Sequence, residues 1–160
     1  MNMFKIVFKL IVRHRTQLCG RGLRVNHLSI VSKNTELGNN VNFNGMRISG
    51  CGKVKIGDNF HSGRDCLMIS QNHNYDNGQA IPYDSTYIPK DITIEDNVWM
   101  GDRVIVLGGA YIEEGSIIQA GSVVIGRIPK YSIAGGHPAK VFKQRDVKHY
   151  ISLKENKKFM

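Results

Sequence analysis

The sequence has few cysteines, few prolines and no long hydrophobic run. Its three cysteines, at positions 19, 51 and 66, form no CxxC pair, which argues against a zinc site or a disulfide framework and favours a reducing cytoplasm. Only 4 prolines occur in 160 residues, so the chain is neither a collagen nor a Pro-rich linker. No apolar run reaches the roughly 18 residues of a membrane span.

Acidic residues are absent from the first 28 positions. That segment carries six basic residues, and residues 141–160 carry six more against Asp146 and Glu155. Residues 29–140 hold 10 basic and 11 acidic residues, so the excess charge of the chain, +9 overall, belongs to its two ends. A nucleic-acid-binding domain more often carries this charge on its folded face, and we expect no nucleic-acid partner.

The first residues are both apolar and basic. Residues 3–12 are interrupted by Lys5 and Lys9, and three basic residues follow in place of a small-residue cleavage site, which disfavours a signal peptide. We expect a short helix over residues 4–12 and a weaker one over 146–159. The N-terminal segment either caps the fold or contacts an anionic membrane surface.

Glycine is abundant, with 17 residues, and the chain has a period of six. From residue 94 onward every sixth residue is apolar, and a smaller residue follows four positions later. Neither a helix (3.6) nor a strand (2) has this period. The apolar set is Ile94, Met100, Val106, Ile112, Ile118 and Val124, and the smaller set is Val98, Val104, Ala110, Ser116 and Ser122. Three such units per turn predict an all-β fold, a triangular parallel β-helix with coils about 4.8 Å apart.

The same register appears earlier in the chain, with interruptions. Two triplets repeat it: Val31, Leu37, Phe43, and Ile56, Ser62, Met68. The 13-residue step between the triplets predicts a bulge at 50–52, and the polar, turn-prone residues 74–87 predict a loop extruded from the prism. We therefore divide the chain into a capping segment, 1–28, a repeat domain, 29–143, and a basic tail, 144–160.

Five segments form recognisable motifs: IGDNF (56–60), NHNY (72–75), ITIEDNVWMGDRVIV (92–106), IQAGSVV (118–124) and IPKYSIAGGHPAKV (128–141). Together they resemble the hexapeptide-repeat acyltransferases, and specifically their maltose/galactoside O-acetyltransferase-like branch. The resemblance covers about residues 30–143. It implies a left-handed β-helix, acetyl-CoA as co-substrate without a metal, and a homotrimer with active sites between its subunits.

Transfer of an acetyl group to an alcohol needs a general base, because a hydroxyl is a poor nucleophile at neutral pH. The resemblance gives this role to a histidine just before the extruded loop, where His73 stands. Backbone N–H groups would stabilise the oxyanion. The γ-type carbonic anhydrases share this fold and bind metal through three convergent histidines. Here His61, His73 and His137 include no closely spaced pair, so we expect no metal.

The resemblance also implies a coenzyme site. Trp99, which the repeat directs outward, would wall the acetyl and acceptor pocket, and Gly101 and Asp102 would approach the pantetheine arm. The turn Ala120, Gly121, Ser122 would bind that arm through its backbone.

The nucleotide end of the coenzyme site departs from the family pattern. Ile125 and Gly126 occupy the positions of a common Thr-Lys pair, and Arg127 could supply the missing cation. Lys140 and Lys143 match basic residues near the 3′-phosphate of coenzyme A.

The acceptor side carries a weaker signal. Asn42 and Asn44 flank the position about 30 residues before His73 where some relatives place an asparagine, and Tyr75 and Trp99 complete the candidates. An acidic acceptor-binding residue of those relatives has no match, since residues 1–28 contain no Asp or Glu. This absence argues against maltose or galactoside as the acceptor.

The favoured function is therefore acetyl-CoA-dependent O-acetylation of a sugar hydroxyl in a surface polysaccharide or its precursor, in the cytoplasm or at the inner face of the membrane. The alternatives are a xenobiotic (antibiotic) O-acetyltransferase, a sugar N-acetyltransferase and a non-catalytic hexapeptide scaffold.

Overall fold

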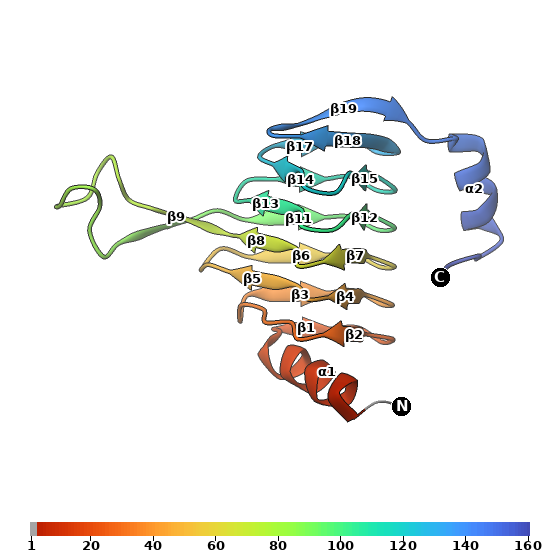
Figure 1. Ribbon diagram of the computed structural model, residues 1–160, viewed down its shortest axis with the longest axis horizontal. Helices are drawn as coiled ribbons and strands as arrows, with labels where there is room; N and C mark the ends of the chain where they lie inside the picture. Colours follow the sequence, from red (N-terminus) through yellow and green to blue (C-terminus); the bar gives the residue numbers. More distant parts are fainter. Residues whose placement is uncertain (1–2) are drawn as a thin grey trace.

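Short strands, parallel except for the antiparallel β18–β19 pair, stack into three sheets that enclose the core (Figure 1). The structure is a computed structural model that describes residues 3–160. Face A contains β1 (Leu18–Cys19), β3 (Thr35–Leu37), β6 (Val54–Ile56), β11 (Ile92–Ile94), β14 (Tyr111–Ile112) and β17 (Arg127–Ile128). Face B contains β2 (Arg24–His27), β4 (Asn42–Asn44), β7 (His61–Arg64), β12 (Trp99–Met100), β15 (Ile117–Ile118), β18 (Ser132–Gly136) and β19 (Ala139–Gln144). Face C contains β5 (Arg47–Ser49), β8 (Leu67–Ile69), β13 (Ile105–Leu107) and β16 (Val123–Val124).

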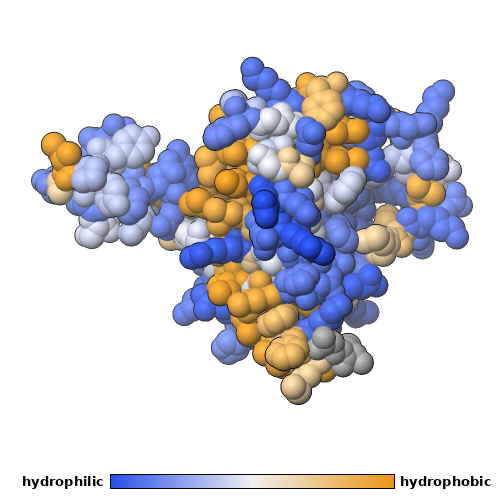
Figure 2. All heavy atoms as spheres, viewed as in Figure 1, coloured by the Kyte–Doolittle hydropathy of each residue, from blue (hydrophilic) through white to orange (hydrophobic). Residues whose placement is uncertain are grey.

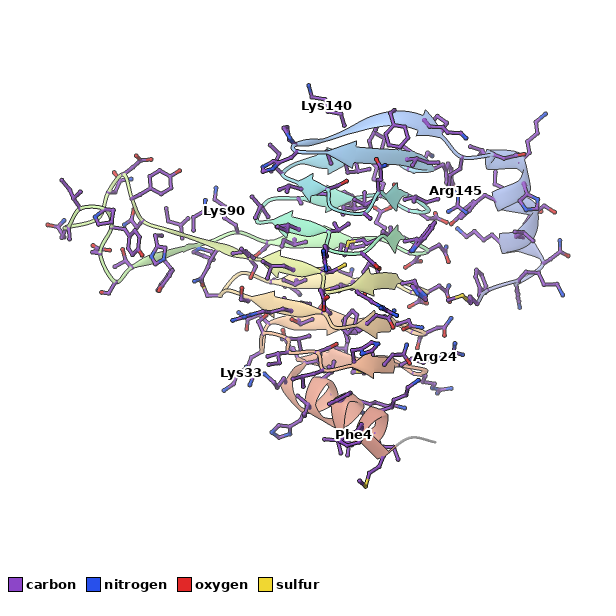
Figure 3. All side chains as sticks on the ribbon, viewed as in Figure 1. Phe4, Arg24, Lys33, Lys90, Lys140 and Arg145 are labelled. Atoms are coloured by element: carbon purple, nitrogen blue, oxygen red, sulfur yellow. The ribbon has the colours of Figure 1, made fainter. Side chains whose placement is uncertain are left out.

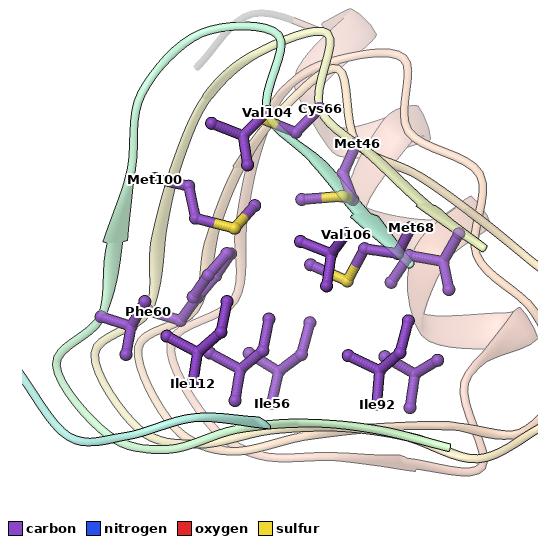
Figure 4. Close-up of a cluster of buried hydrophobic side chains, with 14 of the residues drawn as sticks. Met46, Ile56, Phe60, Cys66, Met68, Ile92, Met100, Val104, Val106 and Ile112 are labelled. Atoms are coloured by element: carbon purple, nitrogen blue, oxygen red, sulfur yellow. The ribbon is translucent and has the colours of Figure 1, made fainter. Parts of the chain in front are cut away.

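The six-residue register forms the core as the sequence predicts. Ile94 pairs with Ile112, Met100 with Ile118 and Val106 with Val124. In each pair the second residue lies one coil further along the solenoid. All six side chains are buried, and Figure 4 shows Met100, Val106 and Ile112 pointing into the interior. Burial of an aliphatic side chain contributes about 1.5–3 kcal/mol, so this ladder stabilises every coil. The all-β, left-handed parallel β-helix is confirmed.

Aspartates at the corners tie each coil to the one before it. The Oδ1 atom of Asp58 accepts a hydrogen bond from the backbone N–H of Asn39, and that of Asp96 accepts one from Asp58, each at 2.7 Å. Gly57 allows this approach, because an added Cβ there would lie 2.3 Å from Asp96 Oδ1. The glycines next to these turns are therefore needed for close stacking of the backbone.

An antiparallel hairpin leaves the prism at the corner between faces C and A (Figure 1). It comprises β9 (Gln71–His73) and β10 (Tyr87–Pro89), and Tyr87 lies opposite His73 in the register. The predicted extruded loop is present, although Tyr87 belongs to the strand and only residues 74–86 form the loop. The predicted bulge at 50–52 is also present, as the turn that joins β5 to β6.

A helix lies near each end of the chain, as expected. The N-terminal helix is α1 (Met3–Arg15) and the C-terminal helix is α2 (Val147–Glu155), whose N-cap Asp146 accepts a hydrogen bond from the backbone N–H of residue 149. Strands β1 and β2 fall within residues 1–28 and pair with β3 and β4, so the sheets begin before residue 29. Neither helix within residues 3–160 is long and apolar enough to cross a membrane.

Helix α2 packs beside face B through its one buried residue, Tyr150. The hydroxyl of Tyr150 donates to Glu114 Oε1 at 2.9 Å, and Lys154 forms an ion pair with the same carboxylate. Burial raises the pKa of Glu114, but the hydrogen bonds from Lys154 and Tyr150 lower it more, so the net pKa is below its usual value. The helix is thus held to the solenoid by a charged carboxylate.

Candidate active site

His73 lies at the end of β9, where the hairpin leaves the prism. Its ring stacks on Tyr83 with centroids 3.6 Å apart and planes 20° from parallel, and Tyr87 lies 4.6 Å away. The Nδ1 atom is buried and has no hydrogen-bond partner among the described residues. Two tyrosines, one from the loop and one from its second strand, therefore orient the imidazole, and its buried Nδ1 makes no hydrogen bond in the described chain.

A shallow groove surrounds this imidazole. Its lining consists of Ile69, Gln71, Asn72, His73, Tyr75 and Tyr83. Tyr75 is exposed and lies in the same groove as His73. The candidate base and one candidate acceptor residue are thus brought together by the hairpin.

Trp99 lies on a different face of the prism. It points outward from β12 with 52% of its surface exposed, directly below Ile117 in the sheet. The groove beside it includes Gly101, Asp102 and Ala120, and Phe142 of β19 closes its upper side. Because an added Cβ on Gly101 would lie 2.6 Å from the Ala120 nitrogen, the two turns stack closely and form a smooth wall.

Two residues of the predicted coenzyme site have structural partners for their side chains. Asp102 Oδ1 accepts a hydrogen bond from the backbone N–H of Arg64 at 2.7 Å, which makes it one of the corner aspartates. Ser122 is buried, and its hydroxyl accepts a hydrogen bond from the Gly136 N–H at 3.1 Å. Gly121 has φ +72°, so the turn needs glycine for its conformation. This turn would therefore contact a ligand through its backbone groups.

The residues predicted at the nucleotide end lie at the corner between faces C and A, above the hairpin. Ile125 is exposed, and Gly126 has open space at its Cβ position. Arg127 donates from Nε to Glu113 Oε1 at 2.5 Å and lies 5.6 Å from the Tyr111 ring, so its cation already has an anionic partner. Hydrogen bonding to Glu113 raises the pKa of Arg127.

Lys140 and Lys143 lie on β19 at the upper end of the solenoid, where Figure 3 labels Lys140. Both are exposed, and neither forms an ion pair with any residue in 3–160. They are therefore available to an anionic ligand, unlike Arg127.

Asn42 and Asn44 lie on β4 in face B and not beside His73. The Nδ2 atom of Asn26 donates to Asn42 Oδ1 at 3.1 Å and to Asn44 Oδ1 at 2.9 Å. Asn44 in turn donates to the Ser62 carbonyl at 2.6 Å. Both side chains thus contribute to an amide network between coils.

The grooves at His73 and at Trp99 share no lining residue. Face C lies between the corner that carries the hairpin and the corner that carries Gly101 and Ala120. A single chain therefore presents two partial sites on separate edges of the prism.

Sequence reasoning missed a cleft between face B and helix α2, which we name the α2 cleft. Its cavity volume is about 440 Å³, and its floor is a column of Asn42, His61 and Trp99, paired one above another in the sheet. His61 Nδ1 is buried without a hydrogen-bond partner among described residues. Burial lowers the pKa of His61, and Arg24 lowers it further. The register could have revealed this column, since His61 precedes Ser62 as Trp99 precedes Met100.

Cations line the α2 cleft, and no Asp or Glu does. The four are Arg24, Arg145, Lys154 and Lys158; Figure 3 labels the two arginines. Lys154 is paired with Glu114, and Arg145 donates to the Gly115 carbonyl at 2.9 Å. Arg24 and Lys158 form no ion pair within the described chain, so two of these four cations are unpaired.

No group of three or more His, Cys, Asp or Glu side chains that could hold a metal ion occurs within residues 3–160. His73 and His61 belong to separate grooves.

Comparisons with known proteins support the hexapeptide-repeat fold. The sequence model of the bacterial transferase hexapeptide family (six repeats) matches residues 91–126. WbbJ of Escherichia coli, named as a lipopolysaccharide biosynthesis O-acetyl transferase, is 36% identical over 95 residues, which cover 51% of this chain and 48% of that protein.

Solved structures with the same fold carry the coenzyme. A galactoside acetyltransferase in complex with coenzyme A superposes with a TM-score of 0.75 at 26% identity, covering 87% of this chain and 70% of that one. The hexapeptide-repeat acetyltransferase VCA0836 of Vibrio cholerae, complexed with acetyl-coenzyme A, gives 0.71 at 26% identity, covering 82% of this chain and 73% of that one.

The fold and the repeat define a hexapeptide-repeat solenoid of the transferase type. The chain carries the repeat of the bacterial transferase hexapeptide family over residues 91–126, and its fold is similar to those of a galactoside acetyltransferase and a maltose O-acetyltransferase. It spans less than half the length of the curated relatives that it matches.

Proposed function

We propose that this chain is an acetyl-CoA-dependent O-acetyltransferase that acts on a sugar hydroxyl of a surface polysaccharide or its precursor. The observation that carries the proposal is the imidazole of His73, which stacks on Tyr83 and lines the groove at the hairpin base. A general base of this kind contributes about 10²–10⁴-fold to the rate.

The reaction follows from this base. His73 takes the proton of the acceptor hydroxyl while the hydroxyl oxygen attacks the thioester carbonyl. Collapse of the tetrahedral oxyanion forms the ester and expels the coenzyme A thiolate, which takes up the proton from the imidazolium. Backbone N–H groups stabilise the oxyanion.

We assign the coenzyme to the wall beside Trp99. Gly101 and the turn Ala120–Ser122 leave room for the pantetheine arm, and their backbone groups would bind it. Lys140 and Lys143 have no ion pair in the described chain and would meet the phosphates. Arg127, already paired with Glu113, is the weakest member of the proposed site. Acetyl-CoA and coenzyme A bound to solved relatives support this assignment.

A homotrimer with active sites between its subunits explains why His73 and Trp99 lie on separate edges. The outward residues of face C beside the hairpin are apolar, whereas face A carries Lys55 and Tyr111 on its strands. The apolar set is Leu67, Ile69, Ile105 and Leu107, all half-buried. Hydrophobic side chains lie beside the point where the hairpin leaves the body in Figure 2. A closed C3 contact through this face would join the His73 groove of one chain to the Trp99 groove of the next.

Light scattering tests the trimer. Three chains of 18.0 kDa give an expected mass of about 54 kDa. Ile105→Glu places a charge on face C and should dissociate the trimer and abolish transfer. Thr93→Glu, on the outer side of face A, serves as the control and should leave the mass unchanged. A stable, fully active species near 18 kDa would contradict the model of a shared site.

The α2 cleft is our candidate for the acceptor site. Trp99 borders both this cleft and the coenzyme groove, so an acceptor in the cleft would lie next to the acetyl group. Its unpaired cations favour an acceptor that carries a phosphate or diphosphate, such as a nucleotide-linked or lipid-linked glycan precursor. An enzyme with such an acceptor would act in the cytoplasm, and at the inner face of the membrane where the acceptor is lipid-linked.

The experiment that tests the function measures thiol release from acetyl-CoA with a panel of nucleotide sugars, neutral oligosaccharides, amino sugars and hydroxyl-bearing antibiotics. We expect release with glycan hydroxyls, abolished in His73→Ala. Release only with amino sugars, or only with antibiotics, would replace the proposal by those activities. Stabilisation by acetyl-CoA without release from any acceptor would favour the scaffold alternative.

A further inference from the structure

Helix α1 presents an apolar ridge to solvent. Met3, Ile6, Val7 and Leu10 follow helical spacing along one side and are 71%, 39%, 46% and 59% exposed. The opposite side packs on the solenoid through Val12, which is buried, and Phe8. The helix therefore has two apolar sides, and only one of them serves the core.

Capping the solenoid does not account for this ridge. The end element of a solenoid normally covers the last coil with its inner side and shows a polar outer side to water. Here the outer side is apolar, and the first coil adds exposed Leu18, Leu28 and Ile30. Figure 2 shows the hydrophobic side chains gathered at this lower end, over α1. Contiguous apolar surface of this kind marks an interaction site.

The charged residues at the α1 end of the solenoid indicate what kind of partner binds there. The segment through residue 28 carries Lys5, Lys9, Arg13, Arg15, Arg21 and Arg24, with no Asp or Glu. On the helical wheel Lys9 and Arg13 flank the ridge on one side, whereas Arg15 donates from Nε to the Val31 carbonyl of the solenoid at 2.9 Å. A second copy of the same end would bring like charges together, which disfavours pairing of two ridges. An anionic membrane surface would bury the apolar ridge and attract the basic residues beside it.

We propose that the α1 end of the solenoid docks onto an anionic phospholipid membrane, with the ridge inserted among the headgroups and the flanking cations against the lipid phosphates. In a trimer with parallel prisms, which rests on the proposed function, three α1 helices would face the same way. Their binding would then be multivalent, and stronger than that of one short helix.

Vesicle co-sedimentation of the full chain tests the proposal. The probes are vesicles of phosphatidylcholine alone and of phosphatidylcholine with 40% phosphatidylglycerol, at about 50 mM and about 500 mM salt. Leu10→Glu removes a ridge residue. Ile151→Glu is the matched control, because it changes an exposed aliphatic residue of α2 by the same charge.

We expect at least tenfold more binding to the anionic vesicles at low salt, with most of it lost at high salt. Leu10→Glu should lower this binding at least tenfold, and Ile151→Glu less than twofold. If Leu10→Glu lowers the melting temperature, Val7→Glu on the same ridge replaces it. Both ridge variants should release thiol from acetyl-CoA in solution as the unmodified chain does. A failure of the docking proposal can therefore be distinguished from a failure of the proposed function.

Three outcomes would overturn the proposal. The first is equal binding to neutral and anionic vesicles, or none to either. The second is wild-type binding by a folded ridge variant. The third is association of trimers without vesicles that Leu10→Glu abolishes, which would make a second copy the partner of the ridge.

Discussion

Replacement of His73 by alanine separates catalysis from binding. Loss of a general base should lower turnover about 10²–10⁴-fold, which corresponds to about 2.7–5.5 kcal/mol of transition-state stabilisation. The KM for acetyl-CoA should change less than threefold, because the proposed coenzyme contacts are made by the wall beside Trp99 and not by the His73 side chain.

The fold should tolerate this substitution. His73 contacts Tyr83 and Tyr87 in the hairpin and does not belong to the buried core. An aromatic pair contributes about 0.5–1.5 kcal/mol, so unfolding free energy should fall by no more than about 2–3 kcal/mol. Initial rates of thiol release, with a melting curve for each variant, measure both effects.

Two further variants sharpen the result. Tyr83→Phe keeps the stacked ring and should retain most of the activity, whereas Tyr83→Ala frees the imidazole and should lower kcat with little effect on KM. His149→Ala, at an exposed position of α2, controls for loss of any histidine. A folded His73→Ala variant that keeps more than about a tenth of wild-type turnover would refute the assignment of His73 as the base.

Three other predictions concern the scaffold. Because the pKa of Glu114 is depressed in the folded state, its contribution is present above the carboxyl's usual pKa and is lost as the pH falls through the folded value; melting temperature should drop below about pH 4, and less so in Glu114→Gln. Burial raises the pKa of Cys66 to about 11, so iodoacetamide at pH 8 should label it only after denaturation, and native labelling would contradict its burial. Gly57→Ala should cost about 1–3 kcal/mol by overpacking against Asp96, while Gly126→Ala, with open space at its Cβ, should be nearly neutral in melting temperature.

The six-residue period by itself determined the solenoid. An inward apolar residue at positions such as Ile94, Met100 and Val106 can repeat every six residues only if three short strands complete each coil. The extruded hairpin could also be located, since the polar residues 74–86 cannot supply an inward side chain. The expected helices followed from composition, although α1 extends to Arg15 and α2 ends at Glu155.

The positions of the candidate site residues depended on the tertiary structure. The sequence predicted that His73 and Trp99 serve one site between subunits, and the tertiary structure shows their places within one chain: His73 lies on the hairpin and Trp99 on face B. Asp102 stays a predicted coenzyme residue, and only the structure shows that its Oδ1 also accepts a hydrogen bond from the Arg64 backbone N–H in the corner turn.

The α2 cleft was decided by tertiary packing alone. The column of Asn42, His61 and Trp99 is implicit in the repeat, yet nothing in the sequence says that a C-terminal helix lies beside it. That placement depends on the contacts of Tyr150 and Lys154 with Glu114, which join residues more than 30 positions apart. Periodicity specifies which side chains point inward or outward, whereas only the folded chain specifies which outward surfaces face one another.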